Sequence, residues 1–81
     1  MNIMNKVKVN NTILLKNIPL NYNENDLKNE FIQFGDIKKI YKKEHTVFAY
    51  ITFKHTFCAF NAFNKLSEKY TIEYAHITKN G

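Results

Sequence analysis

Short apolar runs alternate with polar turns along most of this chain, and their spacing predicts strands and helices in turn. The run from Ile13 to Ile18 stops at Pro19 and a polar turn, which is typical of a strand. The run 47–53 is rich in β-branched and aromatic residues and gives the strongest strand signal. With two weaker runs, the pattern predicts four strands, at about residues 12–18, 37–43, 47–53 and 71–78.

A first helix is expected over residues 24–34, between the first two strands. Apolar residues stand at positions i, i+4 and i+7 from Leu27, which is the spacing of one helical stripe. Asn23 with Asp26 three residues later comes close to a capping box at its start. Gly35 is expected to end the helix in a left-handed conformation, which glycine adopts at little cost.

A second helix is expected over about residues 57–67, behind a cap at Thr56. Phe57 projects away from its apolar side and Phe60 lies at the margin, so both are candidates for contact with a protein partner. The alternative is that a loop or the amino-terminal segment covers them. The apolar side itself consists of Ala59, Ala62, Phe63 and Leu66.

The order of these elements is βαββαβ. Each element has one apolar side, so the economical solution is an α+β, ferredoxin-like sandwich: a four-stranded antiparallel sheet with both helices on one face. A chain of 81 residues has room for one such domain. We expect it over residues 12–79, after a flexible amino-terminal tail of residues 1–11.

The composition limits the partners and the kinds of chemistry that are expected. Twelve lysines and no arginine face seven acids, for a net charge of +5, which suits an anionic partner such as nucleic acid. Cys58 is the only cysteine and is expected in the core, and the three histidines are scattered, so no disulfide, metal, cofactor or catalytic group is expected. No apolar run is long enough to span a membrane, so we expect an intracellular protein without membrane contact. We also expect the domain to be a monomer.

Two of the predicted strands carry a sequence motif. Residues 46–53 read Thr-Val-Phe-Ala-Tyr-Ile-Thr-Phe, and residues 13–18 read Ile-Leu-Leu-Lys-Asn-Ile. In that order they resemble the longer and shorter ribonucleoprotein motifs of the RNA recognition motif (RRM) family, at six of eight positions and five of six. The resemblance covers about residues 12–79 and implies an RRM fold that binds single-stranded RNA. It also implies that Tyr50 stacks on a base and that Phe48 contacts a sugar or a neighbouring base.

Strand geometry gives a physical reason for that function. Successive strand residues point to opposite faces, so one face of the sheet packs under the helices and the other stays open. Rings on the open face offer stacking worth roughly 1–3 kcal/mol per base, and ammonium groups attract phosphates. The predicted RNA-binding residues are Leu14, Lys16, Lys39, Tyr41, Lys43, Phe48 and Tyr50. The alternatives are rings covered by polypeptide, and lysines that only protect a sheet edge.

Some positions depart from the family pattern and predict a weakened surface. Leu14 stands where the family usually has its first stacking aromatic residue. Thr46 replaces a basic residue and Val47 replaces a glycine. Glu73 has a position in the last strand from which its charge would repel phosphate.

The leading hypothesis is a single-stranded RNA-binding module that acts in pre-mRNA or mRNA processing, in the nucleus rather than the cytoplasm. An alternative is a protein-interaction module of the same fold in a ribonucleoprotein complex, which uses the second helix or the sheet face. A small enzyme of the same topology, such as an acylphosphatase, would need an arginine that this chain lacks, so we expect no enzyme.

Overall fold

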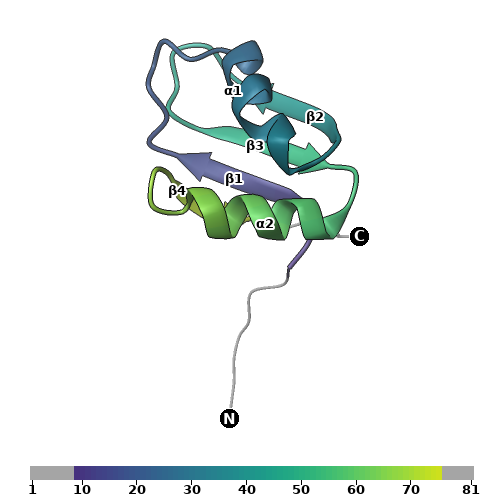
Figure 1. The fold of residues 1–81 in the computed structure, drawn as a ribbon. Helices are drawn as coiled ribbons and strands as arrows, with labels where there is room; N and C mark the ends of the chain where they lie inside the picture. The colour runs from purple at the N-terminus through teal and green to yellow at the C-terminus, as the bar shows by residue number, and fades with distance from the viewer. Residues whose placement is uncertain (1–8, 76–81) are drawn as a thin grey trace, which may run out of the picture.

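The computed structural model describes residues 9–75, which follow the predicted βαββαβ order (Figure 1). The strands form one antiparallel sheet in the order β2-β3-β1-β4. The helices both lie in front of the same face of this sheet, which confirms the ferredoxin-like prediction (Figure 1). The strands are β1 (Thr12–Lys16), β2 (Ile37–Lys42), β3 (Ala49–Phe53) and β4 (Thr71–Tyr74). The helices are α1 (Glu24–Phe31), extended by the 3-10 helix η1 (Ile32–Phe34), and α2 (Thr56–Leu66).

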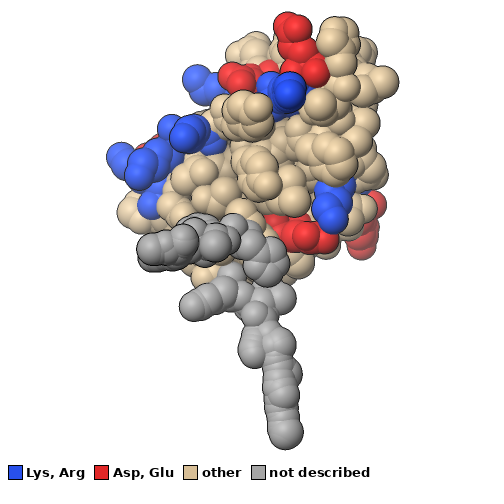
Figure 2. All heavy atoms as spheres, turned by 180° about the vertical axis from the view of Figure 1, so that it is seen from behind, with Lys and Arg blue, Asp and Glu red and all other residues tan. Residues whose placement is uncertain are grey.

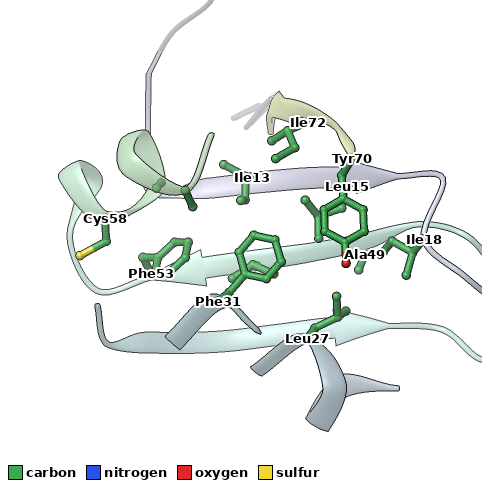
Figure 3. Close-up of a cluster of buried hydrophobic side chains, with 13 residues drawn as sticks. Ile13, Leu15, Ile18, Leu27, Phe31, Ala49, Phe53, Cys58, Tyr70 and Ile72 are labelled. Carbon is green, nitrogen blue, oxygen red and sulfur yellow. The ribbon is translucent and has the colours of Figure 1, made fainter. Parts of the chain in front are cut away.

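The core lies between the helices and the sheet (Figure 3). Along β1 and β3 every second side chain is buried, which is the alternation that an antiparallel sheet with one covered face requires. The buried strand residues are Ile13, Leu15, Ala49, Ile51, Phe53 and Ile72, and they meet Leu27, Phe31, Cys58, Ala59 and Ala62 from the helices. The strand residues between them therefore point to the opposite face.

The start of α1 is the predicted capping box. The Asp26 backbone N–H donates to the Asn23 side chain (2.9 Å), and the Asn23 N–H donates to the Asp26 carboxylate (2.9 Å). The end of the helix differs, because the last turn tightens into η1 before Gly35. Gly35 has the expected positive φ of 138°, but its ψ of −175° is extended and not left-handed helical. A Cβ there would collide with the Cys58 sulfur, so glycine also permits the close approach of α2.

One strand and one helix begin at residues other than those predicted from the sequence. Within the predicted strand 47–53, β3 begins two residues late. The segment before it is fixed in another way, since the Ile18 N–H donates to the Val47 carbonyl (3.0 Å). Helix α2 begins at Thr56, which is therefore a helical residue and not the cap. The cap position is His55, whose side chain makes no capping hydrogen bond.

Strand β2 contains an irregularity that sets which residues face the helices. Ile37 pairs with Phe53, but Lys39 pairs with Thr52, so the register shifts by one residue between them. This is the geometry of a β-bulge, in which one strand carries an extra residue. Because of the shift, Ile37 and Ile40 both pack against the core although they are three positions apart.

The segment before β1 is bonded to the sheet. Residues 1–8 of the predicted flexible tail, like the last residues of the predicted fourth strand, lie outside the described residues. The Asn10 side-chain amide donates to the Ala75 carbonyl (2.9 Å), and the Phe53 N–H donates to the Asn11 carbonyl (2.8 Å). The backbone bond to Asn11 extends the β1–β3 ladder beyond the assigned start of β1, and the Asn10 side chain ties the same segment to the end of β4.

Glu30 links α1 to the turn after α2. Its side chain is only 17% exposed. Its carboxylate accepts hydrogen bonds from the Tyr70 hydroxyl (2.5 Å) and the Lys69 ammonium (2.7 Å). Burial, followed by the bond to Glu30, raises the pKa of the Tyr70 hydroxyl. The same carboxylate raises the pKa of the Lys69 ammonium.

Candidate nucleic-acid interface

The sheet face opposite the helices carries three exposed aromatic rings. The exposed fractions are 53% for Tyr41, 51% for Phe48 and 44% for Tyr50. Figure 2 views the molecule from this side and shows uncharged surface in the middle, with lysine side chains and some acidic ones toward the edges. An exposed cluster of large rings is unusual for a small soluble domain and marks a surface suited to binding.

The pairing register places four side chains in one row across the sheet. Tyr41 of β2 lies opposite Tyr50 of β3, and Tyr50 lies opposite Leu14 of β1. Leu14 in turn lies opposite Glu73 of β4. Side chains directly opposite each other on one face stand within about 5.5 Å at Cβ. The row therefore offers two neighbouring rings, then an aliphatic side chain, then a carboxylate.

A second row runs beside the first and is polar. Lys39 of β2 lies opposite Thr52 of β3, which lies opposite Thr12 of β1. The two threonine hydroxyls are 3.0 Å apart and hydrogen-bond to each other. Lys39 is exposed at the β2 end of this row, where its ammonium is accessible to an anion.

Lys16 and Glu73 form an ion pair on the open face. The Lys16 ammonium donates to the Glu73 carboxylate at 2.8 Å, and both side chains are more than a third exposed. Lys16 follows Leu14 by two residues in β1, so it points to the same face. The predicted phosphate contact at Lys16 therefore has a carboxylate beside it, a pairing that the sequence alone did not predict.

Phe48 and Lys43 lie at the β2–β3 turn, outside the assigned strands. The Thr46 hydroxyl donates to the Lys43 carbonyl (2.8 Å) and lies 3.4 Å from the Phe48 carbonyl. Thr46 thus ties the two sides of the turn together, at a position where the family pattern has a basic residue. Lys43 is exposed and lies one residue beyond the end of β2.

Lys42 lies on the opposite side of β2 from these residues. It is buried opposite Ala49, and its backbone N–H donates to the Glu24 carboxylate (3.4 Å). Four lysines lie within the predicted second strand, residues 37–43, and Lys42 is the buried one. The exposed ones are Lys38, Lys39 and Lys43.

A separate aromatic pair lies on α2. Phe57 is 63% exposed and Phe60 is 47% exposed, as expected from their positions on the helix. The His55 ring stacks on Phe57 with centroids 5.3 Å apart and an interplanar angle of 8°. These rings belong to the helical layer, so they are not part of the sheet surface.

Neither a cluster of metal-ligating side chains nor a membrane-spanning helix is found within residues 9–75. No three His, Cys, Asp or Glu side chains in that range gather closely enough to hold a metal ion. Neither helix there has the length and hydrophobicity needed to cross a membrane.

Comparison with known proteins gives the class of this domain. The family model described as the RNA recognition motif matches residues 13–75, so the chain belongs to the RNA recognition motif family. This confirms the resemblance seen in the two motifs. RRM domains are generally RNA-binding and non-enzymatic.

Solved RRM structures share the fold. The C-terminal RNA recognition motif of the hypothetical RNA-binding protein RBM19 is similar, with a TM-score of 0.77, 22% identity and coverage of 98% of this chain and 86% of that chain. Pes4 RRM3 is also similar, with a TM-score of 0.73, 22% identity and coverage of 88% and 98%. The RRM3 domain of Gbp2 has a TM-score of 0.75, 18% identity and coverage of 93% and 83%. None of the curated protein sequences compared with the chain matches it.

Proposed function

We propose that this domain binds single-stranded RNA by stacking bases on the open face of its sheet. The observation that carries the proposal is the row in which the exposed Tyr41 and Tyr50 are direct cross-strand neighbours. Sequence-tolerant stacking needs flat, accessible rings on a rigid support, since every base has a π-face. The central strand β3 supplies that support, because it is paired on both sides.

The three rings have different roles in this proposal. Tyr50 stacks on a base in the middle of the face, and Phe48 contacts a sugar or the neighbouring base. Tyr41 extends the stacking surface toward the β2 edge. Leu14 offers an apolar contact where many members of the family have another ring, which removes one stack of roughly 1–3 kcal/mol. We therefore propose moderate affinity for RNA.

Lysines at the rim supply the electrostatic part of binding. Lys39 and Lys43 are exposed, and each stands two positions from Tyr41 along the chain. Each phosphate that an ammonium neutralises releases condensed counterions, so binding weakens as salt rises. Lys16 contributes less as a free cation, because Glu73 already holds its ammonium.

The domain acts by holding RNA, without performing chemistry on it. In keeping with this, we propose a role in pre-mRNA or mRNA processing in the nucleus, where the domain positions a single strand for a larger ribonucleoprotein complex. The exposed Phe57 and Phe60 favour a second candidate function, contact with a protein component of such a complex through α2.

The test is a titration of the chain with short single-stranded RNA, followed by amide resonances. We expect the largest shifts at Leu14, Tyr41 and Tyr50, and at the adjoining Lys39 and Phe48. Shifts confined to α2 would contradict the proposal and favour the protein-contact function. Fluorescence anisotropy with random and homopolymeric RNAs gives the affinity, and no measurable binding to any of them would also contradict the proposal.

A further inference from the structure

A carboxylate on a surface that binds a polyanion calls for a physical explanation. Glu73 faces the open side of the sheet, directly opposite Leu14. Its ion pair with Lys16 takes one ammonium out of competition for phosphates. On electrostatic grounds alone, both effects weaken RNA binding. A carboxylate at this position offsets that cost if it accepts hydrogen bonds from a base.

The ion pair presents a defined order of hydrogen-bonding groups. The Lys16 ammonium is a donor, and the two Glu73 oxygens beside it are acceptors. One of these oxygens, Oε2, holds Lys16 at 2.8 Å. Within residues 9–75, the other oxygen accepts no hydrogen bond. The pair thus offers the sequence donor, acceptor, acceptor to a ligand at its exposed side.

Among the four bases, guanine has the complementary edge. Its Watson–Crick edge presents the O6 acceptor, the N1–H donor and the 2-amino donor in that order. The cytosine edge reads donor, acceptor, acceptor and would oppose like groups. Uracil has a single donor between two acceptors, and adenine has one donor and one acceptor. Bases splayed out on an RNA-binding surface expose this edge, as well as the Hoogsteen edge, to hydrogen bonding.

We propose that the Lys16–Glu73 pair selects guanine for a base that lies over Leu14. This inference rests on the proposed RNA binding, and adds which base one subsite takes. Leu14 lies between Tyr50 and Glu73 in the row and supplies an apolar surface for the base. Lys16 donates to O6, while Glu73 accepts from N1–H and the 2-amino group. The leucine weakens stacking, and the ion pair at its side supplies discrimination between bases.

The experiment compares short RNAs that differ at one position. A uridine octamer is measured by fluorescence anisotropy against octamers with one central guanine, adenine or cytosine. A good bidentate contact discriminates by about fivefold to a hundredfold, so the guanine strand is expected to bind at least about fivefold more tightly. An inosine strand, which lacks the 2-amino group, is expected to lose part of that preference.

The Glu73→Gln variant distinguishes hydrogen bonding to the base from simple repulsion between the carboxylate and the RNA. The amide keeps the size of the side chain but replaces one acceptor with a donor, so the guanine preference is expected to disappear. Affinity for the plain uridine octamer is expected to stay the same or rise, because a negative charge is removed. Lys39→Met is the matched control, and is expected to weaken all four strands by the same factor. An unchanged amide spectrum outside the substituted site shows that each variant is folded.

The outcomes are distinct. Equal binding of all four strands by the unmodified chain overturns the guanine subsite and leaves the proposed RNA binding standing. A Glu73→Gln variant that tightens every strand by one common factor also overturns it, because the carboxylate then acts only by repulsion. Failure of all four strands to bind overturns the proposed function and the subsite together.

Discussion

The domain exposes two groups of aromatic rings, on the sheet and on α2, and they differ in what surrounds them. Exposure does not distinguish them, since Tyr50 is 44% exposed and Phe60 is 47% exposed. The sheet rings are neighbours across a paired central strand, with polar and charged side chains in the adjoining positions. The α2 rings have a stacked histidine at one end, where His55 lies against Phe57. Ring exposure alone therefore does not assign a function.

What assigns a function is the set of contacts that the rings and their neighbours make together. A nucleotide needs a flat apolar contact, a cation for its phosphate and hydrogen-bonding groups for its base edge. The sheet face has all three, in Tyr50, Lys39 and Glu73. We therefore expect RNA affinity to respond to changes on the sheet and to be indifferent to changes on α2.

The largest effect is expected from removing the central ring. Tyr50→Ala should weaken RNA binding by about fivefold to a hundredfold, because a stacking contact is worth roughly 1–3 kcal/mol. Phe57→Ala is the matched control, since it also removes an exposed ring, and it should leave RNA affinity unchanged. Fluorescence anisotropy measures both. Similar losses in the two variants would show that the comparison between the two surfaces is wrong.

A gain is expected from restoring the ring that the family pattern usually has. Leu14→Phe places a third ring in the row beside Tyr50, on a side chain that already faces the open side. If a base lies there, one added stack should strengthen binding by about fivefold or more. The same anisotropy assay measures the change, and Phe60→Leu on α2 is a control with no expected effect. An unchanged affinity in Leu14→Phe would indicate that no base reaches β1.

Much of this comparison follows from the sequence, because it depends on local rules. The capping box of Asn23 and Asp26 needs only residues three positions apart. The outward direction of Leu14 and Tyr50 follows from the alternation of buried strands, which is a rule of period two. The pattern of apolar and polar residues predicted the order of the elements, which the structure confirms. The two motifs predicted the family, which the family match confirms.

What the sequence did not predict depends on pairing between distant segments. The Lys16–Glu73 ion pair joins residues 57 positions apart and exists only in the observed register of β1 and β4. Nothing in the sequence pairs Glu30 with Tyr70, which lies 40 positions away. A signal for the β2 bulge was present, since Ile37 and Ile40 are three apart and cannot share a face of a regular strand.

A smaller effect is expected from the lysines at the rim. The logarithm of the binding constant should fall with the logarithm of salt concentration, with a slope of about −0.7 per phosphate neutralised on a single strand. Lys39→Ala and Lys43→Ala should each make this slope less steep by about 0.7. Lys65→Ala, an exposed lysine on α2, is the control and should leave the slope unchanged. Equal slopes in all variants would mean that the β2 lysines do not contact phosphate.

The smallest effect on RNA binding is expected at the buried tyrosine, where the consequence is for stability. Because the pKa of Tyr70 is raised in the folded chain, the unfolded chain loses that proton first as the pH rises past about 10. The resulting stabilisation is complete below that pH and is lost above it.

Tyr70→Phe should therefore leave RNA affinity unchanged and reduce the fall of the unfolding free energy above pH 10, by at most about 1.4 kcal/mol per pH unit. Part of the fall in the unfolding free energy is expected in both proteins, because the pKa values of Lys69 and Tyr74 are also raised in the folded chain. Urea unfolding between pH 9 and pH 11, at about half-unit steps, measures the difference. Identical pH profiles would show that burial and the hydrogen bond to Glu30 do not raise the pKa of the Tyr70 hydroxyl in the folded chain.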